Sequence, residues 1–258
     1  RISHDQAVAH RQVNLELAEA GRVQHTFIPR HSPTISGYDI SGVLLPARET
    51  SGDFYDFIDL EDGKLGVVIA DVGDKGAGAA LYMAMSRTLI RTYAVEGKLP
   101  PEGVIQEVNR RILTDTQRGI FLTVIFGILD PMQALFTYVN AGHNPPYLLR
   151  KQDDELTTTP LEKTGTLVGI FEESRWETKT IKLNPGDILV FYTDGITEAQ
   201  NDSDEFFGNS RFLNTLENGF DPSAKTFRNA ILERLQGFTG NAPRLDDVTL
   251  IIISRDRE

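Results

Sequence analysis

The chain has 258 residues, no cysteine and a formal net charge of −11, with 37 acidic side chains against 26 basic ones. A missing thiol excludes disulfides and thiolate metal sites, and the acidic excess argues against nucleic acid or an anionic membrane as a partner. No apolar run approaches the roughly 20 residues that cross a bilayer, so we expect a cytoplasmic protein without direct membrane insertion.

Residues 5 to 25 have a helical pattern, with Val13, Leu17 and Ala20 at heptad-like spacing. Two interpretations fit this seam. The helix packs its stripe on its own domain, or it connects to a missing upstream module and pairs with a second copy of the chain. The sequence begins without Met or an apolar signal core, and we expect a piece of a longer protein.

Strand patterns cover 38–43 and 54–59, and an Asp-Gly turn in "EDGKL" predicts a hairpin into "GVVIADV". The next segment, 79–94, is predicted to be a well-buried helix. Its apolar stripe would contain Leu81, Met85, Leu89 and Tyr93. A second helix is expected after "LPP", with Val104, Ile105, Val108 and Ile112 on one face.

The period then changes to that of short strands. "GIFLTVIFGILD", "ALFTYVNAG" and "PPYLLRK" indicate a meander, and "RWETKTIKL" and "DILVFYTDG" indicate a further pair joined by "NPG". An amphipathic helix, "PSAKTFRNAILERLQGF", and a closing strand, "DDVTLIIISR", end the chain. Together these elements predict an α+β fold, a four-layer α/β/β/α sandwich of two mostly antiparallel sheets flanked by helices.

A glycine-studded turn follows Asp71, and it raises the question of a nucleotide phosphate loop. Gly73, Gly76 and Gly78 lack the G-x-G-x-x-G spacing, and Lys75 is not followed by Ser or Thr as in a Walker loop. The short connections between strands also disfavour parallel pairing. A nucleotide-binding oxidoreductase is therefore the weakest alternative.

Aspartates stand at the end or the start of apolar strands at several places. They are Asp53, Asp71, Asp194, Asp246 and Asp247. A carboxylate beside a buried strand is costly unless it is hydrogen-bonded or neutralised, and converging carboxylates raise one another's pKa. Hard oxygen ligands without thiols favour Mg²⁺ or Mn²⁺, and several carboxylates favour two ions sharing a bridging aspartate.

The motifs "PARETSGDFYD", "ADVGDKGAGAAL", "NAGHNPP", "YTDGITEA" and "DDVT" occur in this order over nearly the whole chain. In them the chain resembles the metal-dependent type 2C (PPM) serine/threonine phosphatases, specifically the bacterial SpoIIE/RsbU-like branch. The resemblance implies two Mn²⁺ or Mg²⁺ ions, with a third, weakly held ion as an open alternative. The metal ligands it implies are the carboxylates of Asp53, Asp194 and Asp246, the backbone carbonyl of Val72, and the carboxylate of Asp71, which would bridge the two ions. Asp247 would be a supporting residue or the alternative ligand to Asp246.

By the same resemblance, these aspartates act through a metal-activated water that attacks phosphorus in line. The expected substrate is a phosphoserine or phosphothreonine on an anti-anti-sigma (STAS-type) regulator in partner-switching signalling. Residues 1–28 would be the connector from a sensor module, through which a homodimer could form, and 29–258 the phosphatase domain.

The chain departs from the family pattern at two positions, where Ser51 replaces a glycine and Lys75 stands near the place of a histidine. These departures keep a second hypothesis open, a catalytically impaired signalling or dimerisation module of the same fold. Arg48 is a candidate phosphate contact or a solvated surface group. His143 is expected to bond its own turn rather than to bind a metal.

Overall fold

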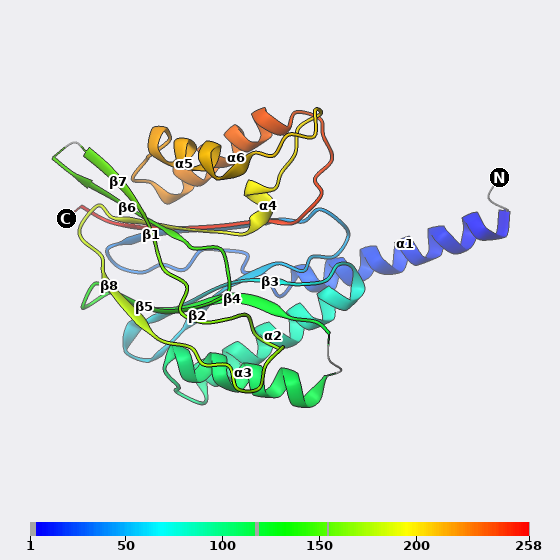
Figure 1. Ribbon diagram of the computed structural model, residues 1–258, viewed down its shortest axis with the longest axis horizontal. Coiled ribbons are helices and arrows are strands. Elements are labelled where there is room, and N and C mark those ends of the chain that lie inside the picture. The colour runs from blue at the N-terminus through cyan, green and yellow to red at the C-terminus, as the bar shows by residue number, and fades with distance from the viewer. Residues whose placement is uncertain (1–3, 117–118, 154, 258) are drawn as a thin grey trace.

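Two five-stranded antiparallel sheets pack face to face in the computed structural model, which describes residues 4–116, 119–153 and 155–257 (Figure 1). The first sheet has the order β2 (Phe54–Asp59), β3 (Leu65–Val72), β4 (Leu122–Asp130), β5 (Leu135–Ala141) and β8 (Lys179–Lys182). The second has the order β1 (Tyr38–Leu45), β10 (Val248–Arg255), β9 (Ile188–Tyr192), β6 (Tyr147–Gln152) and β7 (Glu155–Pro160).

Helices cover the outer face of each sheet, as Figure 1 shows. The first sheet carries α2 (Ala77–Val95) and α3 (Pro101–Asp115), and the second carries α4 (Asp194–Thr197), α5 (Gly208–Asn218) and α6 (Ala224–Thr239). The predicted four-layer α/β/β/α sandwich is therefore confirmed. None of the helices in the described ranges is long and apolar enough to cross a membrane.

The central strands are apolar on both faces because each lies between the opposite sheet and a helical layer. In β3, Val67 and Ile69 face the other sheet, while Val68 and Ala70 pack under the helices. This double burial explains why "GVVIA" is a continuous apolar run rather than an alternating one.

The predicted apolar stripe of α2 is wrong in its placement. The buried residues are Ala79, Met83, Ser86, Ile90 and Ala94, whereas Leu81 is 72% exposed. Met85, Leu89 and Tyr93 are only partly buried at the edge of the core. The face toward the sheet combines Met83 and Ile90 with the small side chains of Ala79, Ser86 and Ala94, and a search for a stripe of large apolar residues overlooks the small ones.

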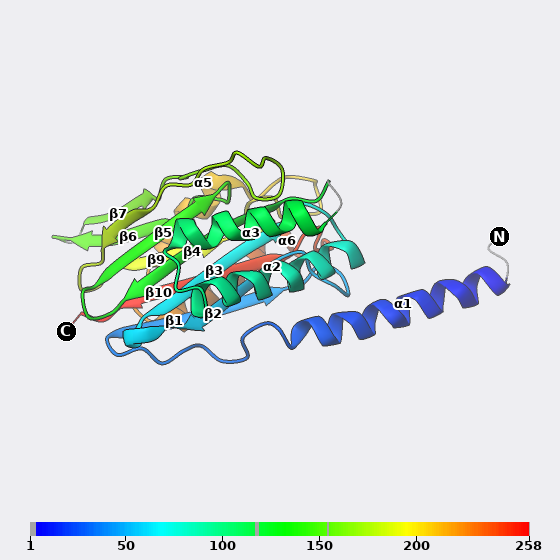
Figure 2. The same ribbon diagram turned by 90° about the horizontal axis from the view of Figure 1, so that it is seen from below.

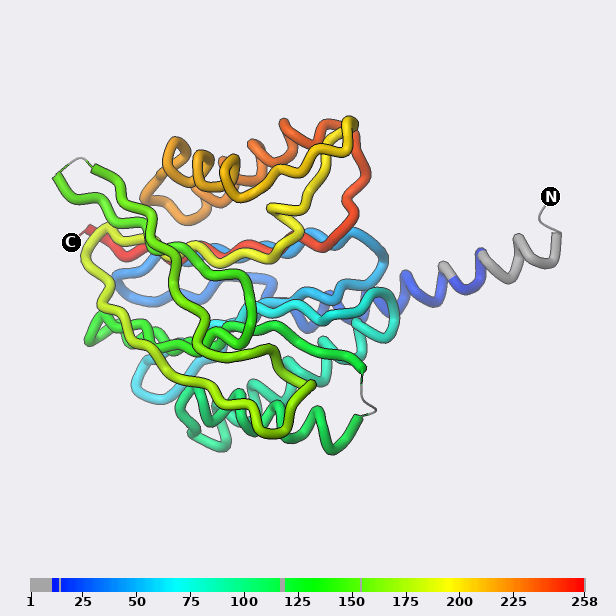
Figure 3. Tube along the Cα trace, viewed as in Figure 1, coloured from blue at the N-terminus to red at the C-terminus, as the bar shows by residue number. Residues whose placement is uncertain are grey.

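Two predicted strand pairings are also wrong. β8 joins β5 in the first sheet while β9 joins β10 and β6 in the second, so "NPG" links the two sheets and is not a hairpin turn. The meander likewise ends after β5, because β6 lies in the second sheet. The trace in Figure 3 shows both crossings between the layers.

The helix α1 (His4–His25) runs away from the sandwich toward the N-terminus (Figures 1 and 2). Val13, Leu15 and Val23 on it are exposed. Its C-terminal end is attached to the domain, because the Gln24 side-chain amide donates to the Ser51 carbonyl (2.6 Å) and accepts from the Ser51 N–H (2.8 Å). The predicted helix thus ends on the segment that contains the first aspartate motif.

Candidate active site

Asp53 lies directly before β2 and connects the two sheets. Its side chain is buried, and Oδ2 accepts hydrogen bonds from the hydroxyls of Thr193 (2.7 Å) and Thr249 (2.6 Å). Thr249 lies in β10 of the second sheet, and Thr193 directly follows β9 of the same sheet. Sequence reasoning missed them, although each stands one or two residues from an aspartate in "YTDG" and "DDVT".

Asp71, near the end of β3, is the centre of the acidic cluster. Burial raises the pKa of its carboxyl to about 7, and Asp194, Asp246 and Asp247 add to the shift. The pKa of Asp53 is also raised well above its ordinary value, first by burial and then by Asp71. The structure therefore brings the sequence-predicted aspartates to one end of the sandwich, where they repel one another.

Asp194 is the first residue of α4, and Gly195 brings it close to the second pair of aspartates. A Cβ atom on Gly195 would lie 1.9 Å from the Asp247 carbonyl oxygen, so only glycine fits there. Burial, then Glu198 and Asp246, raises the pKa of Asp194. Gly195 thus lets the end of β9 approach the start of β10, which places the carboxylates of Asp194 and Asp246 together.

Asp246 and Asp247 have different surroundings. Asp247 is buried, and it accepts hydrogen bonds from the backbone N–H of Ala47 (2.7 Å) and Gly52 (2.9 Å) and from the Ser51 hydroxyl (2.8 Å). Asp246 is partly exposed and its Oδ2 lies 2.7 Å from the Lys75 ammonium. Asp247 therefore anchors the segment 47–52, while Asp246 pairs with the partly exposed ammonium of Lys75.

A small pocket lies among these groups. It is lined by Ala47, Arg48, Thr50, Gly52, Asp71, Asp74, Lys75, Gly76, Leu245, Asp246 and Asp247. Arg48 is exposed on its wall. The Val72 carbonyl accepts the Asp74 N–H (2.7 Å) and faces Gly52, where a Cβ would lie 3.2 Å from that oxygen. Gly52 thus leaves space beside the Val72 carbonyl.

The donor set suits a hard divalent cation, although it is not arranged as a finished site. Within the part of the chain that the structure describes, no three acidic or histidine side chains are spaced as metal ligands. The local contacts explain this, because Asp53 faces hydroxyls, Asp247 faces backbone amides and Asp246 faces Lys75. Uncompensated carboxylates at raised pKa are nevertheless what Mg²⁺ or Mn²⁺ would neutralise, so the residues fit such ions.

His143 lies between the sheets, just behind the cluster. Its backbone N–H bonds Asn140 Oδ1 in its own turn (2.8 Å), as predicted. Its ring reaches further: Nε2 donates to the Tyr192 carbonyl (3.2 Å), which leaves Nδ1 to accept from the Thr123 hydroxyl (2.9 Å). Thr123 is opposite Asp71 in the β3–β4 register. Burial lowers the pKa of the ring to about 4, so it is neutral at pH 7.

The buried imidazole predicts a specific pH dependence of stability. Between pH 6.5 and about 4 the unfolded chain binds a proton at this histidine that the folded chain rejects, so the free energy of unfolding falls as pH falls. In His143→Gln, urea unfolding at pH 7, 6 and 5 should show a slope smaller by about 1 kcal/mol per pH unit. An unchanged slope in His143→Gln would contradict the assignment.

The two neighbouring aspartates should differ in stability without metal. Asp247→Ala leaves the N–H groups of Ala47 and Gly52 without their acceptor, so in EDTA it should lower the free energy of unfolding by about 2 kcal/mol. Asp246→Ala removes a partly exposed ion pair and a source of repulsion, and should change it by less than about 1 kcal/mol. Equal losses in urea titrations would argue against the anchoring role of Asp247.

Comparisons with known proteins agree with this geometry. The family described as Stage II sporulation protein E (SpoIIE) matches residues 61–256. Protein IcfG of Synechocystis sp. is 34% identical over 94% of this chain and 42% of its own length, so the chain spans less than half of that relative. Phosphoserine phosphatase RsbU of Bacillus subtilis is 28% identical over 95% of this chain and 71% of its length.

Solved structures support the fold. The SiaA-PP2C domain of Pseudomonas aeruginosa superposes with a TM-score of 0.80 at 19% identity, covering 98% of this chain and all of that one. The RsbU and RsbW domains of a Mycobacterium tuberculosis protein give a TM-score of 0.71 at 26% identity, covering 87% of this chain and 62% of that one. The chain belongs to the SpoIIE family and has the fold of the PP2C serine/threonine phosphatases.

Proposed function

We propose that the chain is a Mn²⁺- or Mg²⁺-dependent phosphatase of phosphoserine and phosphothreonine in proteins. One observation carries the proposal: separate segments bring Asp53, Asp71, Asp194 and Asp246 to one end of the sandwich, where burial and mutual repulsion raise the pKa of the first three. Such a cluster is unfavourable unless a cation compensates it. Membership of the SpoIIE family supports the same chemistry.

The residues that would hold two ions are the carboxylates of Asp53, Asp71, Asp194 and Asp246 and the carbonyl of Val72. Bound there, Mn²⁺ or Mg²⁺ would supply Lewis-acid neutralisation of phosphoryl charge and make water a better nucleophile at neutral pH. Thr193 and Thr249 orient Asp53 by donating to Oδ2. Asp247 positions Gly52 and thereby the backbone before Asp53. Arg48 would contact the phosphate from the pocket wall.

The protein substrate we propose is a phosphorylated STAS-type regulator in partner-switching signalling, since a relative over nearly the whole chain is named phosphoserine phosphatase RsbU. The N-terminal helix would connect to a sensor module and pair with a second copy. Along the predicted heptad-like stripe, Val13 and Ala20 are exposed and Leu17 is partly exposed, which supports such pairing.

The competing hypothesis of an impaired signalling module has one specific observation in its favour. Lys75 compensates Asp246 through an internal ion pair at 2.7 Å, so this carboxylate has a partner without any metal. Metal binding separates the two hypotheses, because an impaired module need not bind Mn²⁺.

The proposed activity predicts that Mn²⁺ binds to the purified chain in calorimetric titration and supports hydrolysis of an aryl phosphate and of a phosphoserine peptide. Asp194→Asn should lower kcat/KM on the order of 100-fold, because the cation loses a charged oxygen. Asp202→Asn, an exposed aspartate in the loop after α4, is the matched control and should keep wild-type activity. Absence of Mn²⁺ binding together with absence of hydrolysis would reject the phosphatase.

The Lys75–Asp246 pair makes a further prediction about the metal itself. Because the ammonium and a divalent cation compete for Asp246, Lys75→Met should bind Mn²⁺ about two- to tenfold more tightly in calorimetry without substrate. Lys64→Met removes a comparable pair with Asp130 in the first sheet and should leave the Kd unchanged. A weaker Kd in Lys75→Met would show that Lys75 supports the site rather than competing in it.

A further inference from the structure

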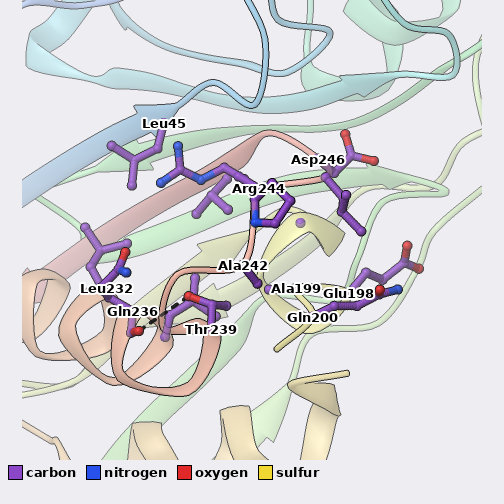
Figure 4. A pocket seen from close by; sticks show the side chains of 15 residues that line it. Leu45, Glu198, Ala199, Gln200, Leu232, Gln236, Thr239, Ala242, Arg244 and Asp246 are labelled. Carbon is purple, nitrogen blue, oxygen red and sulfur yellow. Dashed lines mark hydrogen bonds between the residues drawn. The ribbon is translucent and has the colours of Figure 1, made fainter. Parts of the chain in front are cut away.

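A second pocket borders the acidic cluster and has no part in the proposed chemistry. It has a volume of about 250 Å³ and lies between α4, the C-terminal half of α6 and the segment 242–246 (Figure 4). Gly195, Asp246 and the exposed Leu245 lie in its wall. Asp246 also lines the small pocket beside Asp71. The two pockets are therefore neighbours that share a carboxylate.

The lining of this second pocket is apolar at several positions and contains one basic side chain. Leu45, Leu232, Leu235, Ala242 and Val248 contribute to it. Arg244, the single basic side chain among its lining residues, donates from Nη1 to the Pro46 carbonyl (3.0 Å). The Gln236 side-chain amide donates to the Gly240 carbonyl (2.7 Å), and the dashed line in Figure 4 is a different bond, from the Thr239 hydroxyl to the Gln236 carbonyl.

Size and charge limit what this pocket accepts. A volume of about 250 Å³ lies below the roughly 300–1,000 Å³ of sites for cofactors and drug-sized ligands. An anionic ligand would meet the two carboxylates of Glu198 and Asp246 in the wall against the single guanidinium of Arg244. An uncharged apolar side chain fits both limits.

We propose that this pocket, defined by Leu45, Leu232, Leu235, Ala242 and Val248 and called the Leu232 pocket, binds an apolar side chain of the substrate protein next to its phosphorylated residue. The inference rests on the proposed function. A substrate that presents phosphoserine to the aspartates must lay its neighbouring residues along the adjoining surface. The two pockets share Asp246, so a residue close in sequence to the phosphoserine would lie at the second pocket, and each residue of an extended chain adds roughly 3.3 Å of reach.

The test uses five synthetic phosphoserine peptides and the Mn²⁺-loaded chain. One peptide has alanine at every position flanking the phosphoserine, and the others have leucine two before, one before, one after or two after it. The wild-type chain should hydrolyse at least one leucine peptide with a kcat/KM about tenfold above that of the alanine peptide. Equal rates for all five peptides would overturn the proposal.

A variant then locates the preference. Ala242→Phe fills the pocket, so it should abolish the leucine preference, measured as the ratio of kcat/KM for the leucine and alanine peptides. The control is Ala230→Phe, the same type of substitution in a different groove, between α5 and α6. It should retain the wild-type ratio. A leucine preference that survives in a folded Ala242→Phe would also overturn the proposal.

Failure of the proposed function has a different signature. In that case the chain would hydrolyse neither the peptides nor an aryl phosphate, whatever the flanking residue. If the wild-type chain hydrolyses the aryl phosphate but shows no preference for any leucine peptide, only the Leu232 pocket is rejected. If Ala242→Phe does not fold, Ala199→Phe, which lines the same pocket from the segment after α4, supplies the same comparison.

Discussion

Burial of Asp53 and Asp71 side by side is the constraint on which the rest of the site depends. Asp53 is buried, Asp71 is partly so, and both lie close to further acidic groups, so desolvation and these charges raise the pKa of both carboxyls. The fold offsets part of this cost with the hydroxyls of Thr193 and Thr249. Because these donors come from the second sheet and Asp53 precedes a strand of the first, the relative position of the sheets determines the electrostatics of the cluster.

The segment 47–52 connects this cluster to the N-terminal helix. Asp247 binds the segment from the domain side, and Gln24 binds Ser51 from α1 through two hydrogen bonds. Gly21 permits the contact, since a Cβ there would lie 1.8 Å from the Glu49 carbonyl oxygen. Ser51, which replaces a glycine of the family pattern, bonds α1 through backbone atoms that a glycine would also offer. What the serine side chain adds is the hydroxyl bond to Asp247.

Much of the fold could be predicted from local patterns, and the errors have a common cause. Runs such as "GVVIADV" and the helix after "LPP" have periodicities that neighbouring residues set by themselves. The partner of a strand is not local: β6 and β9 each follow a strand of the other sheet after a short connection. The strand β7 and the helix α5 were missed because "ELTTTP" is largely exposed and "GNSRFLNTLEN" contains few apolar residues.

The sequence by itself determined the family and the acidic residues of the candidate site, because aspartates beside apolar strands and glycines form ordered motifs within short segments. Only the tertiary structure decided how each carboxylate is used. Asp53 meets Thr193 and Thr249 across 140 and 196 residues of sequence, and Asp247 meets Gly52 across 195. The adjacent Asp246 and Asp247 are chemically identical in the sequence, and they differ because folding brings backbone amides to one and the Lys75 ammonium to the other.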